Sequence, residues 1–137
     1  MKPVLLDSGP LIALFNKSDK YHKLSVDFIK KNKRQLVTTI ANITEVVYVL
    51  AYSRDAQSSF LKWMSLSSIV VESIESEEIL EICELFEKYN DVPMDFADAC
   101  MVYLGDKLGT NEIATIDSDF EIYRLKGRKA FKNILNQ

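Results

Sequence analysis

The sequence predicts an α/β fold: one domain with a central parallel sheet of four to five short strands and helices on both faces. Short apolar runs that favour strands alternate along the chain with longer segments that favour helices. The predicted strands are mostly apolar throughout, which is typical of a parallel sheet that is covered on both faces. A chain of 137 residues is the size of one ordinary domain, and neither a linker nor an internal repeat divides it.

Five segments are predicted to form the strands, at residues 3–6, 36–40, 69–71, 113–116 and 129–131. The first four are rich in Leu, Val, Ile and Thr, which pack well in a buried sheet. The first strand ends abruptly at Asp7, before a Ser-Gly-Pro turn signal.

Helices are predicted between these strands. Pro10 suits the first position of a helix that runs to Phe15, with Ser8 or Gly9 as its cap. Asn42 is expected to open another helix. Helical spacing also covers residues 21–33, 57–66, 76–89 and 93–108, and the last of these segments is apolar nearly all round, which predicts burial.

The composition excludes several classes of protein. A chain that is 47% hydrophobic and 27% charged can bury a core and stay soluble, so it is not intrinsically disordered. The net charge of −3 lacks the basic excess of a protein that coats DNA, so any contact with nucleic acid must be local. Cys83, Cys100 and a single histidine cannot form a four-ligand zinc site, and we expect both thiols to be reduced and buried.

The apolar amino terminus does not match a signal peptide. Asp7 interrupts it, no small-residue cleavage pattern follows, and the chain has no uninterrupted apolar run of membrane-spanning length. These observations predict a cytoplasmic protein that does not enter a membrane.

Two acidic residues follow predicted strands directly. Asp7 comes after the first strand and Asp117 after the fourth, so parallel strands would bring both carboxylates to the edge where ligand sites of such sheets lie. Either residue alone could simply cap a helix or form a turn. Ser118 and Glu121 already match a capping box, however, and this leaves Asp117 without a capping role.

Three acids fall in predicted helices. The run from Asn42 to Glu45 resembles a capping box, so Glu45 is open to two interpretations, a helix cap or a site residue. Asp98 lies in the apolar helix, where an ionised carboxylate is costly unless a cation or several donors compensate it. Asp95, in the first turn of that helix, is explained by the helix dipole.

Acids that converge without a basic neighbour repel one another, and their pKa values rise unless a hard cation neutralises them. A site with oxygen ligands alone suits Mg²⁺ or Mn²⁺ and disfavours zinc. Such an ion can activate water and stabilise charge on a phosphoryl group, so the chemistry that the residues suggest is phosphoester hydrolysis.

At this point the sequence resembles the PIN-domain proteins, in particular the VapC-type toxin ribonucleases of toxin–antitoxin pairs. Four segments in order carry the resemblance over nearly the whole chain: LLDSGPLIAL at 5–14, TIANITE at 39–45, MDFADA at 94–99 and ATIDSDF at 114–120. The resemblance implies a PIN domain over residues 1–137. It also implies that four acids bind Mg²⁺ or Mn²⁺ and activate water for RNA cleavage: Asp7, Glu45, Asp98 and Asp117.

The family pattern suggests auxiliary residues as well. Ser8 and Thr115 match its hydroxyl positions, where they could bond a carboxylate or a water, or serve only in capping and packing. Asp119 matches a further acid of some members, and Asp95 is another auxiliary candidate. Gly9 departs from the Asn or Ser common at its position, which removes a side-chain hydrogen bond there.

Basic segments at 17–34 and 121–137 could neutralise phosphates beside an acidic centre, although such runs are often only solvated helix faces. Arg124, Lys126 and Arg128 are the preferred RNA contacts because they follow Asp117 closely. The acidic segment 72–91 is expected to face away from RNA.

The resemblance implies three partners: an RNA substrate, a cognate antitoxin whose tail occupies the acidic site, and a second copy in a homodimer. Tyr48, Tyr52 and Trp63 could belong to such faces if they are exposed, or to the core. A different class of function stays open, in which a PIN-like module binds RNA or protein without cutting it. The presence of all four principal acids argues against that alternative.

Overall fold

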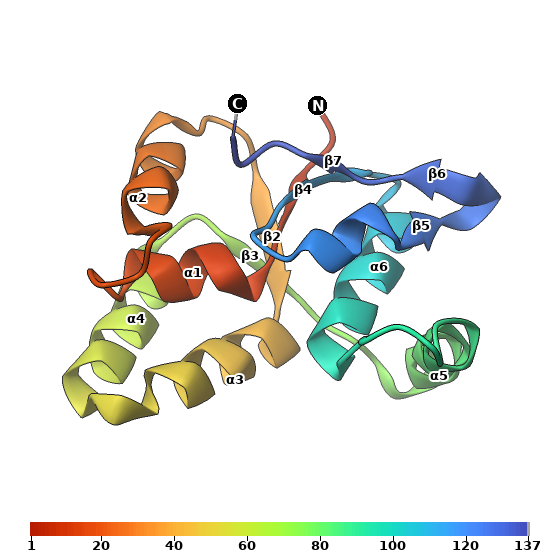
Figure 1. Ribbon diagram of the computed structural model, residues 1–137, viewed down its shortest axis with the longest axis horizontal. Helices are drawn as coiled ribbons and strands as arrows, with labels where there is room; N and C mark the ends of the chain where they lie inside the picture. The colour runs from red at the N-terminus through yellow and green to blue at the C-terminus, as the bar shows by residue number, and fades with distance from the viewer. Residues whose placement is uncertain (137) are drawn as a thin grey trace.

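The computed structural model describes residues 1–136 and confirms the predicted α/β class. Its centre is a five-stranded sheet in the order β3-β2-β1-β4-β7, in which every neighbouring pair is parallel. Figure 1 shows this sheet between two groups of helices. The strands are β1 (Val4–Leu6), β2 (Leu36–Thr39), β3 (Val70–Glu72), β4 (Glu112–Ala114) and β7 (Lys132–Asn133), with β5 (Arg124–Leu125) and β6 (Lys129–Ala130) in a separate antiparallel pair.

Six α-helices and four short 3₁₀ helices connect these strands in the described chain. The α-helices are α1 (Ser8–Leu14), α2 (His22–Lys31), α3 (Ile40–Val49), α4 (Arg54–Leu66), α5 (Ile79–Lys88) and α6 (Phe96–Leu108). The 3₁₀ helices are η1 (Leu50–Tyr52), η2 (Ser76–Glu78), η3 (Ser118–Glu121) and η4 (Lys126–Arg128). In residues 1–136, no helix combines the length and the apolar character that a membrane crossing demands.

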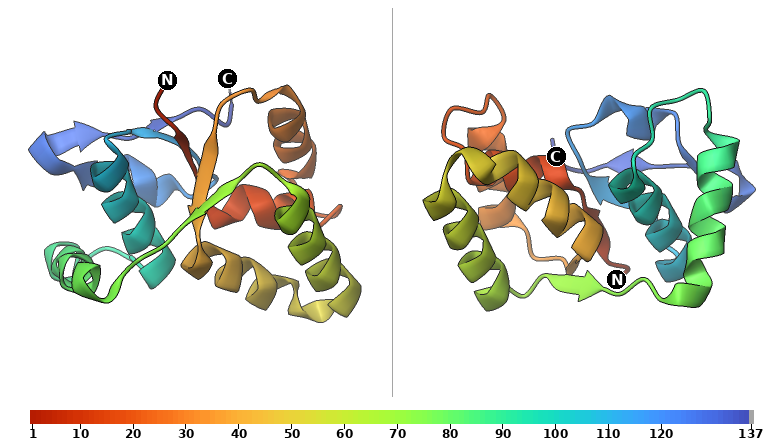
Figure 2. Two further views of the ribbon diagram at one scale, coloured as in Figure 1. Left: turned by 180° about the vertical axis from the view of Figure 1, so that it is seen from behind. Right: turned by 90° about the horizontal axis from the view of Figure 1, so that it is seen from below.

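The alternation of side chains along β1 divides the core into two layers. Val4 and Leu6 pack into a cluster that α1, α3 and α4 complete, with partly buried residues of α2 at its margin. Leu5 points to the other face, against Met101 and Leu104 of α6. The two views in Figure 2 show α1 to α4 and α5 to α6 as groups on opposite sides of the sheet.

The carboxyl-terminal segment differs from its prediction. Residues 129–131 were expected to form one strand, but β6 pairs with β5 outside the main sheet, and only β7 extends that sheet beside β4. Gly127 and Arg128 both have positive φ and make the tight turn between β5 and β6. These strands are two residues long, too short to give a hydrophobic period in the sequence.

Two helix starts also differ from their predictions. The helix α1 begins at Ser8 with Asp7 at its cap position, so Pro10 is the third helical residue and not the first. Proline is tolerated there because the first-turn N–H groups have no partner inside a helix. The helix α3 begins at Ile40, and the Thr39 hydroxyl accepts a hydrogen bond from the Asn42 backbone N–H, so Asn42 does not open this helix.

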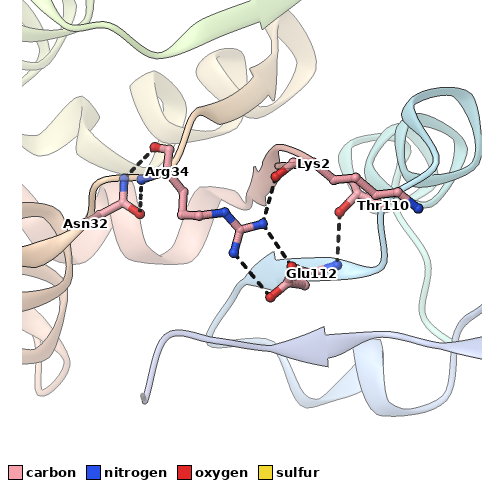
Figure 3. Close-up of polar contacts among 5 residues, drawn as sticks. All are labelled: Lys2, Asn32, Arg34, Thr110 and Glu112. Carbon is pink, nitrogen blue, oxygen red and sulfur yellow. Dashed lines mark hydrogen bonds and ion pairs between the residues drawn. The ribbon is translucent and has the colours of Figure 1, made fainter.

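A charged contact links three segments at the amino ends of the strands (Figure 3). Arg34, just before β2, donates to both carboxylate oxygens of Glu112 on β4, at 2.9 and 3.4 Å. The same guanidinium donates to the Lys2 carbonyl oxygen, before β1, at 2.7 Å. Three segments that are distant in sequence are therefore tied together by one side chain.

Candidate active site

The carboxyl ends of β1 and β4 bring Asp7 and Asp117 to one edge of the sheet, as predicted. The two strands are parallel, and Thr115 connects the residues that follow them. Its hydroxyl donates to Asp7 Oδ2 at 2.6 Å and accepts from the Asp117 backbone N–H at 3.0 Å. The predicted hydroxyl at position 115 therefore bonds a carboxylate directly.

Asn42 supplies the second hydrogen bond to Asp7. Its side chain is fully buried, and its Nδ2 donates to Asp7 Oδ1 at 3.3 Å and to Ser8 Oγ at 2.9 Å. The Thr39 hydroxyl donates to Asn42 Oδ1 at 2.6 Å. Sequence reasoning missed this role, because Asn42 also fits the local pattern of a helix cap.

Glu45 lies on α3 and takes no part in capping, since Thr39 caps that helix. Burial and a hydrogen bond with the carboxyl group of Asp95 raise the pKa of Glu45 to about 7, against a lowering by the Ser8 hydroxyl. The capping interpretation of Glu45 is therefore wrong. Glu45 and Asp95, at the start of α6, line the same hollow of the structure.

Asp95 and Asp98 form a capping box at the start of α6. The Asp98 backbone N–H donates to Asp95 Oδ1 at 2.8 Å, and the Asp95 backbone N–H donates to Asp98 Oδ2 at 3.2 Å. The predicted burial of Asp98 is confirmed, and Tyr123 Oη donates to its Oδ2 at 3.4 Å. Burial, with the negative charges of Asp95 and Asp7, raises the pKa of Asp98 to about 8.

The electrostatics of this edge oppose ionisation. Burial, followed by the charges of Asp117 and Asp95, raises the pKa of Asp7 to about 6, although the hydrogen bond from Thr115 lowers it. Burial and the neighbouring Asp119 raise the pKa of Asp117 as well. In the part of the chain that the structure describes, no Lys, Arg or His forms an ion pair with any of the four principal acids. We call this set the acidic centre: Asp7, Glu45, Asp98 and Asp117.

The donor chemistry of the acidic centre fits a hard divalent cation. All of its side-chain ligand atoms are carboxylate oxygens, and positive charge would relieve the repulsion that raises their pKa values. Among residues 1–136, no three Asp, Glu, His or Cys side chains stand close enough to hold one ion in the observed rotamers. An ion would therefore have to draw these side chains together, while the elements that carry them already meet at one edge.

Two hollows flank the acidic centre. One, of about 790 Å³, lies between α3, the segment after β3 and the start of α6, and includes Glu45, Asp95, Tyr48 and Phe96 in its wall. The other, of about 210 Å³, lies beside Asp117. Between them the two hollows expose Glu45 and Asp117 of the acidic centre.

The remaining predicted residues lie at varied distances from this centre. The Asp119 backbone N–H donates to Asp117 Oδ1, which makes Asp117 the cap of η3, so the expectation that Asp117 has no capping role is wrong. Arg124 donates to the carbonyl oxygens of Glu121 and Tyr123. Lys126 pairs with Glu81 of α5 at 3.8 Å, and Arg128 is exposed in the turn after β5. None of the three bases forms an ion pair with the acidic centre in the described chain, and their contact with RNA stays a prediction.

The exposure of other predicted residues is mixed. Tyr48 and Tyr52 are exposed, whereas Trp63 packs edge-on against Phe15 at the margin of the core. Cys100 is buried as expected, but Cys83 is exposed on α5, so the prediction of two buried thiols is wrong for Cys83. Cys83 is exposed because α5 buries only one narrow face, on which Ile82 is the fully buried residue among those described.

Comparisons with known proteins show the family and the fold of this chain. The chain is 25% identical over 116 residues to Ribonuclease VapC26 of Mycobacterium tuberculosis, covering 83% of this chain and 86% of that protein. The crystal structure of M. tuberculosis VapC20, described as a sarcin-ricin loop cleaving toxin, superposes with a TM-score of 0.81 at 17% identity. That match covers 87% of this chain and 93% of VapC20. The family model of the PIN domain matches residues 4–126, so the chain belongs to the PIN-domain family.

Proposed function

We propose that the protein is a metal-dependent endoribonuclease that acts as the toxin of a toxin–antitoxin pair. One observation carries the proposal: four separate segments bring carboxylates to one sheet edge, and no ion pair within residues 1–136 compensates them. Such a cluster opposes folding unless a cation completes it. The similarity to proteins named as a ribonuclease and as a sarcin-ricin loop cleaving toxin supports RNA as the substrate.

We expect Asp7, Glu45, Asp98 and Asp117 to hold Mg²⁺ or Mn²⁺. When bound, the ion supplies positive charge that makes water more acidic and stabilises the phosphoryl group during cleavage. Each Asp7 oxygen accepts one side-chain hydrogen bond, from Thr115 or from Asn42, which keeps a lone pair on each oxygen for a ligand. Asp98 accepts its bonds at Oδ2 and keeps Oδ1 free of hydrogen bonds in the described chain.

We also propose that the protein binds a cognate antitoxin and forms a homodimer. The large hollow beside Glu45 and Asp95 supports this expectation, because its rim exposes apolar side chains that a partner could cover. Ile40, Tyr48, Ile79 and Phe96 are all more than one-third exposed there. Light scattering after size-exclusion chromatography, with wild type and Tyr48→Ser, would test the dimer: loss of the larger species only in the variant is expected.

The deciding experiment compares RNA cleavage by wild type, Asp7→Asn, Asp98→Asn and Glu112→Gln. Each protein is assayed with Mg²⁺, with Mn²⁺ and with a chelator. Cleavage should require a metal, disappear in the two Asp variants and survive in Glu112→Gln, whose carboxylate lies at the opposite edge of the sheet. Equal cleavage by all four proteins would contradict the proposal. RNA binding that ignores the chelator, without cleavage, would favour the non-catalytic alternative.

A further inference from the structure

Building on the proposed function, we propose that Asn42 is a positioning residue that orients Asp7, a ligand of the acidic centre, by bonding both Asp7 and the adjacent Ser8. The side-chain amide of Asn42 bonds other side chains and no backbone group. It lies where β1, β2, α1 and α3 meet.

The two hydrogens of one amide group reach two different acceptors. Asn42 Nδ2 donates to Asp7 Oδ1 at 3.3 Å and to Ser8 Oγ at 2.9 Å, so both of its N–H bonds are used. The side chain is 0% exposed, and water therefore cannot replace it without a rearrangement of the core. A buried donor that faces a buried carboxylate is worth more than one at the surface, since the local dielectric constant is low.

Ser8 is the second acceptor of the Asn42 amide. Its hydroxyl accepts from Asn42 Nδ2 at 2.9 Å and donates to the Asn42 carbonyl oxygen at 3.5 Å, at the limit of a hydrogen bond. The amide therefore bonds two consecutive residues, Asp7 and Ser8, at the turn from β1 into α1. This pair of bonds orients the Asp7 carboxylate relative to the helix that follows it.

The orientation of the amide is itself determined by Thr39. Thr39 Oγ1 donates to Asn42 Oδ1 at 2.6 Å, so the oxygen of the amide faces β2 and the nitrogen must face the acids. The same hydroxyl accepts the Asn42 backbone N–H and caps α3. Since Thr39 caps the helix, the Asn42 side chain is not needed to start it. Its hydrogen bonds to Asp7 and Ser8 are therefore independent of capping.

The test uses Asn42→Leu, which keeps the branched shape and the number of side-chain heavy atoms of Asn but removes both donors. The matched control is Gln57→Met, because Gln57 is another buried amide whose Nε2 donates to a backbone carbonyl oxygen, that of Val47 at 2.7 Å, and to none of the acids. Three quantities are measured: the Mn²⁺ dissociation constant of the metal-free protein by calorimetry, kcat and KM for RNA cleavage, and Tm without metal.

We expect Asn42→Leu to weaken Mn²⁺ binding about 10-fold or more and to lower kcat by a similar factor, with KM nearly unchanged. Gln57→Met should lower Tm and leave the Mn²⁺ dissociation constant unchanged. If Asn42→Leu does not fold, Thr39→Val serves instead: it leaves the Asn42 amide free to turn and should weaken Mn²⁺ binding by a smaller factor.

The outcomes separate this inference from the proposed function. A fall in Tm for Asn42→Leu with Mn²⁺ affinity unchanged, while Asp7→Asn loses the ion, would overturn the positioning role alone. Equal Mn²⁺ binding by wild type and Asp7→Asn would overturn the metal site, and the role of Asn42 with it.

Discussion

At the amino ends of the strands, Glu112 receives both of its hydrogen bonds from Arg34, whereas at the carboxyl ends Asp7 and Asp98 are buried with no basic partner in the described residues. The pKa of Glu112 is lowered by Arg34, and the pKa values of Asp7 and Asp98 are raised, first by burial and then by like charge. The same sheet therefore carries a compensated charge at one edge and uncompensated charges at the other.

This difference in charge compensation indicates that one edge stabilises the fold and the other is suited to bind a cation. A charge with its partner in place stabilises the folded chain modestly and needs nothing further. Uncompensated buried carboxylates reduce the stability of the fold and are tolerable where a cation is to be bound. Substitutions in the acidic centre should therefore lower activity without lowering stability, whereas substitutions at the opposite edge should lower stability without lowering activity.

The largest effect is expected for Asp7→Asn. Removal of one carboxylate from the acidic centre should lower kcat/KM for RNA about 100-fold or more, since ion binding contributes several kcal/mol to the reaction. Because a buried charge is removed and the shape is kept, Tm of the metal-free protein should stay the same or rise. A parallel fall of activity and Tm would show that Asp7 serves the fold and not the site.

Saturating Mn²⁺ should stabilise the wild-type protein. At about 100 times the dissociation constant, binding adds about 2.7 kcal/mol to the free energy of unfolding, which raises Tm by roughly 5–10 °C for a chain of this size. Differential scanning fluorimetry with and without a chelator measures the shift. Glu112→Gln should show the same rise as wild type, and Asp98→Asn little of it; a rise of equal size in Asp98→Asn would place the ion elsewhere.

The pH dependence of stability should have opposite signs at the two edges. The folded pKa values of Asp7, about 6, and Asp98, about 8, exceed the unfolded value near 4, so the native state binds more protons in that range. Stability of the metal-free protein should accordingly fall between about pH 4 and pH 8 as these groups ionise, with Tm dropping on the order of 5 °C. Thermal melts at about pH 5 and about pH 8 test this, and Asp98→Asn should flatten the difference.

The contribution of Glu112 runs the other way. Its folded pKa is lowered, so its stabilisation is present above the unfolded value and is lost as the pH falls through the folded value. For the acidic centre, the contradicting result is a change of Tm with pH in Asp98→Asn that equals that of the wild type. Groups outside the acidic centre would then set the pH dependence.

The smallest effect is expected at the compensated edge. Arg34→Gln removes a partly exposed ion pair and should lower the free energy of unfolding by about 1 kcal/mol or less, while RNA cleavage stays at the wild-type rate. Urea denaturation measures the change. A loss of several kcal/mol would indicate that the bond from Arg34 to the Lys2 carbonyl oxygen also anchors the amino terminus.

The sequence predicts the fold and the meeting of Asp7 and Asp117 for a simple reason: parallel strands bring their carboxyl ends to one edge. The burial of Asp98 also follows from sequence, because the helix around it is apolar on nearly every face. These features depend on local patterns that repeat over a whole element.

The role of Asn42 could not be predicted in this way. Its bond to Asp7 joins residues 35 positions apart, and its local pattern with Glu45 is identical to that of a helix cap. Asp117 was misread for a related reason: Ser118 and Glu121 satisfy a capping pattern, but the cap of η3 falls one residue earlier. A local pattern identifies a helix start only within a residue or two, and which side chain is then free for the site depends on that register.

The departure at Gly9 constrains a second position. A Cβ at residue 9 would stand 3.2 Å from Ile116 Cβ, so any side chain there would press α1 and the chain after β4 apart by a few tenths of an ångström. Because Asp117 follows Ile116 directly, that small displacement would be passed to a residue of the acidic centre. The common family residue should therefore be installed in this protein together with a shorter side chain at position 116.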